Sequence, residues 1–165
     1  MRIVLMYSTH RPSPEHIASL ERLGDDIEVV VAADEPHAIE VCQQAQIILG
    51  HRYLRQVLPS ASELTFVQST AGGVDRLPLV ELSAMQVRLC RCTIASTTIA
   101  RHAVTCAWAI ARMLPTAWAR QQDRQWRMDF DWPSQPRRAL IVGAGAIGQA
   151  VAKLLAQDGI EVIGV

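Results

Sequence analysis

The chain has 165 residues, of which 50% are hydrophobic and 19% are charged, so it can bury the core of one ordinary domain, or of a small domain plus a piece of another. Sixteen basic residues balance sixteen acidic ones, which leaves no long-range attraction for nucleic acid or an anionic membrane. No apolar run approaches the roughly 18 residues that a membrane span needs, and the short apolar N-terminus predicts a strand instead of a signal peptide. We therefore expect a cytoplasmic globular protein.

The first half of the chain alternates apolar strands with helices. Ser13 is a favourable N-cap, and Pro14 suits the first position of a helix that ends at Gly24. Strands are expected over residues 2–8, 27–31, 47–49, 65–69 and 87–92, and helices over residues 14–23, 35–44 and 54–58. Strands alternating with helices of this length predict an α/β fold with a parallel sheet.

A glycine pair follows the fourth expected strand, in the segment QSTAGGVD at residues 68–75. In open α/β sheets, ligands bind at the edge formed by the carboxyl ends of the strands, where this segment lies. Backbone N–H groups at Gly72 and Gly73 would form a concavity for an anion such as a carboxylate. A tight turn without a ligand explains the same residues equally well, so both interpretations stay open.

A long amphipathic helix is expected over residues 99–113. One apolar stripe recurs at spacings of four and three residues, and a stripe rich in alanine lies beside it. The first stripe contains Ile99, Ala103, Cys106, Ile110 and Met113, and the second contains Ala100, Val104, Ala107, Ala111 and Leu114. Pro115 should end or kink this helix and begin the next one. Residues 121–136 are predicted to form an irregular linker.

Residues 137–165 carry the clearest motif, a strand that leads through G-x-G-x-x-G into a helix and a second strand. The first glycine permits the tight turn, the second lets a pyrophosphate approach the backbone, and the third allows close packing of helix on strand. Free N–H groups at the helix start would meet the phosphate charge. A purely structural turn is the alternative, but the whole context favours a nucleotide. The predicted cofactor-binding residues are Gly143, Gly145, Ala146, Ile147 and Gly148.

The same motif leads to two further expectations. The apolar run at residues 139–142 is typical of a parallel strand covered on both faces. The carboxylate that would hold an adenosine ribose lies about 20 residues into such a motif, and Val165 is the last residue of the sequence. The cofactor is therefore expected to be NAD or NADP, with the choice left open.

The four cysteines form neither a C-x-x-C pair nor a disulfide spacing pattern. Two of them, Cys90 and Cys92, would share one face of a strand with no histidine near them in sequence. We therefore expect buried, reduced thiols and predict no metal site. The cysteines are Cys42, Cys90, Cys92 and Cys106.

Three of these stretches together resemble the N-terminal half of the D-isomer-specific 2-hydroxyacid dehydrogenases, which include glyoxylate/hydroxypyruvate reductases. Residues 66–75 resemble the family's substrate loop, whose backbone amides hold the substrate carboxylate. Residues 99–104 are similar to the start of the long helix that joins the two domains, and residues 140–148 to the cofactor turn. The resemblance implies that Ala71, Gly72 and Gly73 bind substrate, and Arg52, which follows a strand at the same edge, is a further candidate.

The sequence also departs from the family pattern. Arg101 stands where the family usually has glutamate, and Ala95 where asparagine is common, which leaves the subfamily open. The family's catalytic Arg, Glu and His belong to a second half with no counterpart before Val165. No catalytic residue is therefore assigned here, and hydride transfer is expected only in a longer parent protein. The five histidines are expected to have structural or solvated roles; they are His10, His16, His37, His51 and His102.

The resemblance implies a flavodoxin-like substrate domain over residues 1–95, a hinge helix and linker over 96–136, and the first βαβ unit of a Rossmann domain over 137–165. It implies an NAD(P)-dependent oxidoreductase that acts on a small 2-keto or 2-hydroxy acid and forms a homodimer. A non-catalytic nucleotide-binding module, as in corepressors of the same fold, is the alternative. Relatives of alanine dehydrogenase or homocysteine hydrolase fit the glycine turn but not the STAGGVD loop.

Overall fold

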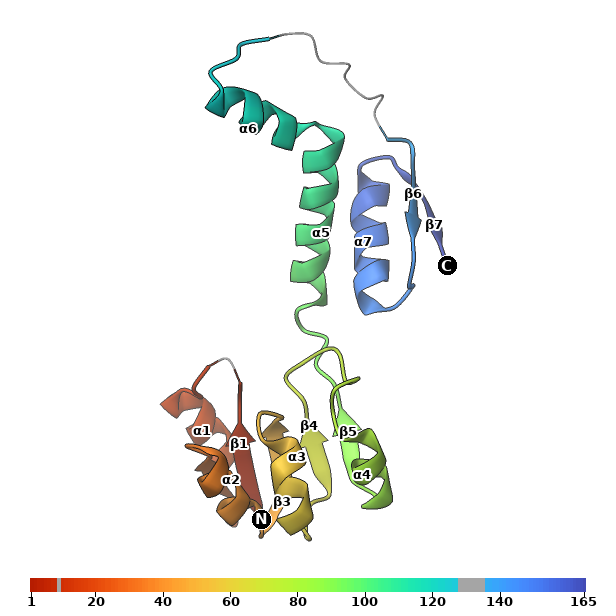
Figure 1. Ribbon diagram of the computed structural model, residues 1–165. Coiled ribbons are helices and arrows are strands. Elements are labelled where there is room, and N and C mark those ends of the chain that lie inside the picture. Colours follow the sequence, from red (N-terminus) through yellow and green to blue (C-terminus); the bar gives the residue numbers. More distant parts are fainter. Residues whose placement is uncertain (9, 128–135) are drawn as a thin grey trace. The chain divides into compact units, whose positions relative to one another are not determined.

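The computed structural model describes residues 1–8, 10–127 and 136–165 (Figure 1). The chain divides into two compact units, Met1–Thr93 and Ile94–Val165. Each unit is built around its own parallel sheet, of five strands in the first and two in the second.

The five strands of the first unit lie in the order β2-β1-β3-β4-β5, and all neighbours are parallel. This order is that of flavodoxin-like folds, so the predicted fold class is confirmed. The strand order reverses direction between β1 and β3, which places the ligand edge of the sheet at their carboxyl ends. The strands are β1 (Arg2–Met6), β2 (Glu28–Val31), β3 (Ala45–Gly50), β4 (Phe66–Gln68) and β5 (Arg88–Cys90).

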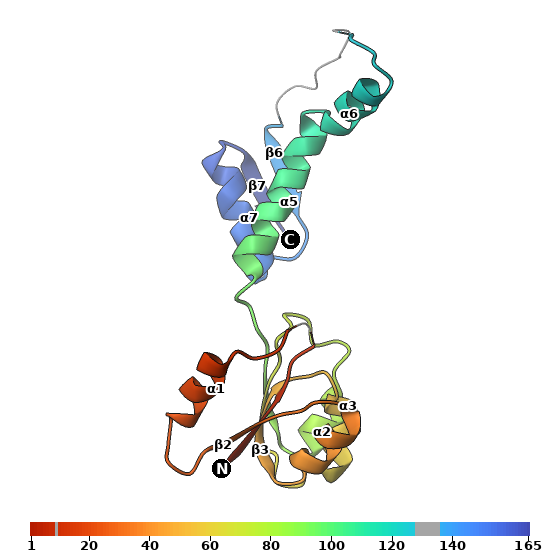
Figure 2. The ribbon, with the colours of Figure 1, turned by 90° about the vertical axis from the view of Figure 1, so that its left-hand side faces the viewer.

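Helices lie on both faces of this sheet, with α1 on one side and α2 and α3 on the other (Figure 2). The first helix begins as predicted, because the Oγ of Ser13 accepts from the N–H of His16 and Pro14 occupies its first turn. A short helix before β5 was not predicted, since its six residues have no capping side chain. The helices are α1 (Pro14–Glu21), α2 (Glu35–Cys42), α3 (Leu54–Val57) and α4 (Leu79–Ala84), with a 3-10 turn, η1, at Leu58–Ser60.

The core of the first unit lies between the sheet and the α2, α3 and α4 helices. Val4, Ile48 and Val67 of the three central strands are 0% exposed and pack in one cluster with residues of all three helices. At roughly 2 kcal/mol for each fully buried aliphatic side chain, this cluster supplies the main stabilisation of the unit. The helical members of the cluster are Ala38, Cys42, Leu54, Val57 and Leu82.

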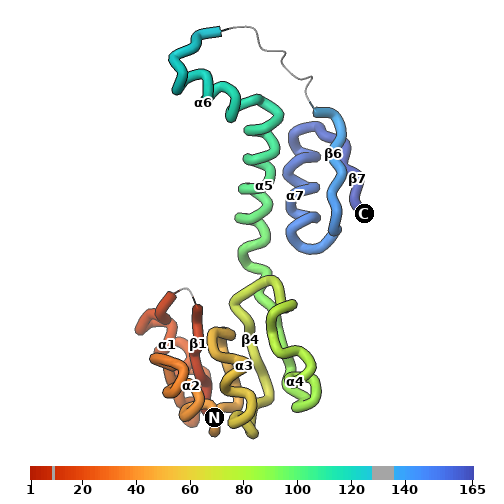
Figure 3. The backbone as a smooth tube through the Cα atoms, viewed as in Figure 1, coloured from red at the N-terminus to blue at the C-terminus, as the bar shows by residue number. Residues whose placement is uncertain are grey.

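The second unit begins with two helices joined at a sharp turn (Figure 3). Met113 adopts the left-handed conformation between them, with φ at 54°, and Pro115 occupies the first turn of the second helix, as predicted. The expected linker at residues 121–136 begins after Gln122, and its part at 128–135 lies outside the described residues. The elements are α5 (Ser96–Ala111), α6 (Leu114–Gln122), β6 (Arg138–Ile141), α7 (Ala146–Gln157) and β7 (Glu161–Gly164).

Within this unit, α7 packs against the β6–β7 pair and also against α5 (Figure 1). The indole N–H of Trp108 on α5 donates to a carboxylate oxygen of Asp158 at the end of α7, over 2.8 Å. Ala100, on the alanine-rich stripe of α5, is 0% exposed. The first apolar stripe of α5 remains exposed, with Ile99 at 46% and Ile110 at 70%.

The expectation that residues 139–142 are covered on both faces is wrong for the described part of the chain. Leu140 and Ile163, which pair across β6 and β7, are 64% and 46% exposed. Val142, just beyond β6, is 81% exposed. The apolar run reflects a strand that one helix layer, α7, covers on a single face.

The expectation of buried thiols holds only for Cys42, because Cys90 and Cys106 are exposed and Cys92 is intermediate. Cys92 also lies beyond the end of β5, so it does not share a strand face with Cys90. Among the described residues, no group of three or more His, Cys, Asp or Glu side chains is arranged to hold a metal ion. None of the helices in the described ranges has the length and apolarity that a bilayer crossing requires.

Candidate functional site

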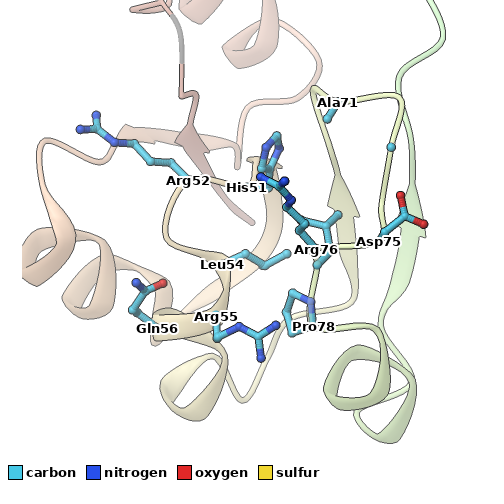
Figure 4. A pocket seen from close by; sticks show the side chains of 11 residues that line it. His51, Arg52, Leu54, Arg55, Gln56, Ala71, Asp75, Arg76 and Pro78 are labelled. Carbon is cyan, nitrogen blue, oxygen red and sulfur yellow. The ribbon is translucent and has the colours of Figure 1, made fainter.

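A cavity of about 510 Å³ opens at the carboxyl edge of the first unit's sheet, beside the loops that follow β3 and β4 (Figure 4). Both loops that the sequence singled out contribute to it, through Arg52 from one and Ala71 and Gly73 from the other. Gly72 belongs to the second loop but does not line the cavity. The lining residues are His51, Arg52, Leu54, Arg55, Gln56, Ala71, Gly73, Asp75, Arg76, Leu77 and Pro78.

Two side chains connect these loops beneath the cavity. Ser69 is 0% exposed, and its Oγ accepts the N–H of Ala71 at 3.1 Å. The same Oγ lies 3.1 Å from Nδ1 of His51. When His51 is neutral and carries its proton on Nε2, the hydroxyl donates to Nδ1. His51 therefore has the structural role expected of it, and it ties the loop after β3 to the loop after β4.

The glycine pair leaves the loop's backbone donors open. Among the described residues, neither the N–H of Gly72 nor that of Gly73 has a hydrogen-bond acceptor. The carbonyl of Ala71 is occupied, because it accepts the N–H of Cys92 at 3.0 Å. A Cβ at Gly72 would lie 3.2 Å from the carbonyl oxygen of Cys92, tighter than ordinary packing allows. Small residues here thus permit close approach to the chain after β5 and leave donors for an anion.

Basic side chains dominate the charge around this cavity, but they differ in their partners. Arg55 forms an ion pair with Glu81 at 3.2 Å. Arg52 stacks on the ring of Tyr53, with 4.9 Å between its guanidinium carbon and the ring centre. Figure 4 shows the end of Arg52 pointing away from Ala71 and Arg76. The predicted substrate contact from Arg52 would therefore need its side chain to swing round.

Arg52 also borders a second cavity of about 510 Å³, at the carboxyl ends of β1 and β2. The phenol of Tyr7 lies there, 2.8 Å from Nε2 of His16. Burial raises the pKa of Tyr7, so this phenol stays protonated at neutral pH. The residues around this cavity are Leu5, Tyr7, Ser8, His10, Arg11, Pro12, Val31, Ala32, Ala33 and Arg52.

The second unit holds the predicted nucleotide turn, between β6 and α7. Gly143 has φ at +97°, a conformation that residues with a Cβ rarely adopt. A Cβ on Gly148 would overlap the carbonyl oxygen of Gly143 and lie 3.2 Å from Cγ2 of Ile141. A Cβ on Gly145, in contrast, would meet no atom within 4 Å. The first and third glycines are thus required by the fold, whereas the second leaves open space above the turn.

The start of α7 presents unused donors to that space. Gly145 is its N-cap and offers no side-chain acceptor, and the first intrahelical bond runs from the N–H of Gln149 to the carbonyl of Gly145. The N–H groups of Ala146, Ile147 and Gly148 consequently have no acceptor within the described ranges. No acidic side chain lies in the first turn of α7 to neutralise the positive helix end. These residues fit the pyrophosphate of a dinucleotide.

Two residues at this site were not predicted from the sequence: Arg76, which lines the cavity, and Ser69, which lies buried beneath it. Ser69 lies at the end of a buried strand and was counted as part of that strand. Arg76 directly follows the glycine loop at residues 68–75, and this position in the sequence could have indicated that it lies near the ligand edge. Only the fold shows that Arg76 lines the same cavity as His51 and that Ser69 is hydrogen-bonded to His51.

A family model, D-isomer specific 2-hydroxyacid dehydrogenase, NAD binding domain, matches residues 104–165, which contain the glycine turn and α7. This match supports the family resemblance seen in the sequence over the C-terminal part of the chain, residues 104–165. No curated protein sequence matches the chain.

Solved structures of similar fold include several dehydrogenases. A D-isomer specific 2-hydroxyacid dehydrogenase family protein from Aeromonas salmonicida is 24% identical, with a TM-score of 0.76, and the match covers 99% of this chain and 52% of that one. A D-lactate dehydrogenase from Treponema pallidum is 19% identical, with a TM-score of 0.75 and coverage of 99% and 53%. An NAD-dependent formate dehydrogenase from Staphylococcus aureus, in complex with NAD, is 19% identical, with a TM-score of 0.72 and coverage of 99% and 56%. The chain thus spans about half the length of these structures.

Proposed function

We propose that this chain supplies the substrate-carboxylate loop and the pyrophosphate turn of an NAD(P)-dependent oxidoreductase. Its substrate would be a small 2-keto or 2-hydroxy acid of the glyoxylate or hydroxypyruvate class. The N–H groups of Gly72 and Gly73 hold the substrate carboxylate, with Ala71 and Arg52 beside them. The cofactor turn comprises Gly143, Gly145, Ala146, Ile147 and Gly148, and its ligand is NAD or NADP. No residue of this chain is assigned to proton transfer.

One observation carries the cofactor part of the proposal. The open space at Gly145 lies over a helix start whose first three N–H groups have no acceptor in the described part of the chain. A turn that served structure alone would gain from a side-chain cap at this N-terminus, at about 1 kcal/mol, and Gly145 provides none. A bound phosphate group would satisfy the same donors.

Titration with NADH tests this assignment. Gly145→Val should weaken NADH binding at least tenfold, because a branched side chain would fill the space that the pyrophosphate needs. Ala156→Val is the matched control, since it places the same side chain at an exposed position near the other end of α7, and it should bind as the wild type does. Calorimetry would give the affinities. Equal affinity of all three folded proteins would show that the turn does not hold the cofactor.

The wider assignments belong to the same proposal. Residues 1–95 act as the substrate domain, residues 96–136 as hinge helix and linker, and residues 137–165 as the start of the dinucleotide-binding domain. The protein is a homodimer, because α5 leaves an apolar stripe uncovered in the second unit. A cytoplasmic location fits the four cysteines, which are all free thiols.

A further inference from the structure

We infer that Arg76 selects 2-keto acids that carry a second anionic group, a carboxylate or a phosphate ester, at the end remote from the keto acid. This inference rests on the proposed function, in which the N–H groups of Gly72 and Gly73 hold the first carboxylate. It adds a specificity residue to that site, and its substrates differ from glyoxylate and hydroxypyruvate by the second anionic group.

Arg76 is the cavity cation that lacks a partner. It makes no hydrogen bond or ion pair with any described residue, whereas Arg55, across the same cavity, is neutralised by Glu81 at 3.2 Å. Arg52 lies against the ring of Tyr53. A guanidinium left open beside an anion-binding loop favours a further anion, because it presents planar donors that match carboxylate and phosphate oxygens.

The directions of the side chains support this role. Figure 4 shows Arg76 directed from its loop toward His51, on the side of the cavity where the loops after β3 and β4 meet. Asp75 is the one acidic residue in the lining, and its carboxylate points away from His51 in the same view.

The size of the cavity agrees with a longer ligand. A two-carbon keto acid has about five heavy atoms and fills on the order of 150 Å³, at the ~30 Å³ that liquid water occupies per molecule. The cavity holds about 510 Å³, which leaves room for a further carbon chain and its anionic end. A monoanionic two-carbon acid would leave both this space and Arg76 unused.

Two matched ligand pairs test the inference on the full 165-residue chain. In the first pair, 2-oxoglutarate carries a carboxylate where 2-oxovalerate has a methyl group. In the second, 3-phosphohydroxypyruvate carries a phosphate that hydroxypyruvate lacks. Affinities come from titrations followed by the ¹H–¹⁵N signals of Gly72 and Gly73, which also report whether the ligand occupies the loop. In at least one pair, the member with the second anionic group should bind about tenfold more tightly, as a charge-assisted contact predicts.

Arg76→Gln should abolish that tenfold difference and leave the affinity for the member without the second anionic group unchanged. Arg55→Gln is the matched control, because it removes a cation from the same cavity that is already paired with Glu81. It should retain most of the difference. Thermal melts followed by circular dichroism would confirm that both variants fold.

The outcomes separate this inference from the function on which it rests. Equal affinity within both pairs, or a difference that persists in Arg76→Gln, would overturn the role of Arg76. The assignment of the Gly72 and Gly73 loop to the first carboxylate would be unaffected. Binding of no acid, with the Gly72 and Gly73 signals unmoved, would overturn the proposed function and the inference with it. A preference seen only in the phosphate pair, or only in the carboxylate pair, identifies the second anion.

Discussion

Single glycines in the nucleotide turn have different physical roles, and the sequence pattern predicted these roles correctly for two of them. Gly143 occupies a left-handed turn with φ at +97°, and Gly148 lies against the carbonyl of Gly143. These requirements follow from local chain geometry, which a short motif encodes. The N–H groups of α7 that follow Gly145 and lack an acceptor are also a local feature, because the first N–H groups of any helix have no intrahelical partner.

Gly148→Ala should therefore lower the free energy of unfolding by about 2 kcal/mol, since the added methyl group overlaps a backbone carbonyl that cannot rotate away. The better helix propensity of alanine offsets at most about 1 kcal/mol of this cost. Urea denaturation followed by the fluorescence of Trp108, which is hydrogen-bonded to Asp158, gives the measurement. Gly164→Ala is the control, because a Cβ there meets no atom within 4 Å. Similar stability of the two variants would contradict the assigned contact.

Side-chain contacts between distant loops could not be predicted in this way. His51 and Ser69 lie 18 positions apart and meet only because β3 and β4 are neighbours in the sheet. The same holds for Arg76, whose open guanidinium becomes apparent only when Arg55 is seen to be paired with Glu81. Sequence reasoning placed the segments that contain His51 and Ser69 at the ligand edge of the sheet but could not show that the two side chains are partners.

At the scale of elements, apolar periodicity located the helices but did not show which faces are covered. The first stripe of the α5 helix, through Ile99 and Ile110, is exposed, while the alanine-rich stripe contains the buried Ala100. The alanine side chains let α5 and α7 approach closely, which favours the alanine-rich stripe of α5 as its buried face. Because periodicity does not show which faces are covered, the strand at residues 139–142 was expected to be covered on both faces, whereas β6 is covered on one.

The thiols test which element faces are buried. Burial raises the pKa of Cys42 on α2 to about 11, whereas Cys90 is exposed on the β5 edge strand. At pH 8 iodoacetamide should therefore modify Cys90 at least 100-fold faster, because the thiolate fraction of Cys42 is lower and its sulfur is covered. Peptide mapping by mass spectrometry measures both rates, and both thiols should react alike in guanidinium. Equal rates in the folded protein would mean that the inner face of α2 is open.

The same pKa shift sets a pH dependence of stability. Because the pKa of Cys42 is higher in the folded than in the unfolded state, its contribution is complete below pH ~8.5, the usual thiol pKa. This contribution decreases as the pH rises through about 11. Alkaline destabilisation is thus expected from the buried thiol of the first unit.

At the scale of the whole molecule, the two units differ in how much of their apolar surface they cover. The first unit buries a continuous cluster of aliphatic side chains beneath α2, α3 and α4. The second leaves both a helix stripe and one face of its two-stranded sheet exposed, with Val142 at 81% and Leu140 at 64%. A two-stranded parallel sheet also has two unpaired edges, which makes it a poor independent unit. The second unit therefore needs a partner more than the first.

We predict that the 165-residue chain forms a homodimer through the exposed α5 stripe and the β6–α7–β7 unit, because large uncovered apolar patches on one chain are buried most readily against a copy of themselves. Light scattering at micromolar concentration should give twice the 18.2 kDa of one chain. Ile110→Glu places a charge in the middle of the stripe and should give the monomer mass. Thr105→Glu, which adds the same charge elsewhere on α5, should remain dimeric. A monomeric wild type with a cooperative melt would refute this assembly, as would equal masses for the two variants.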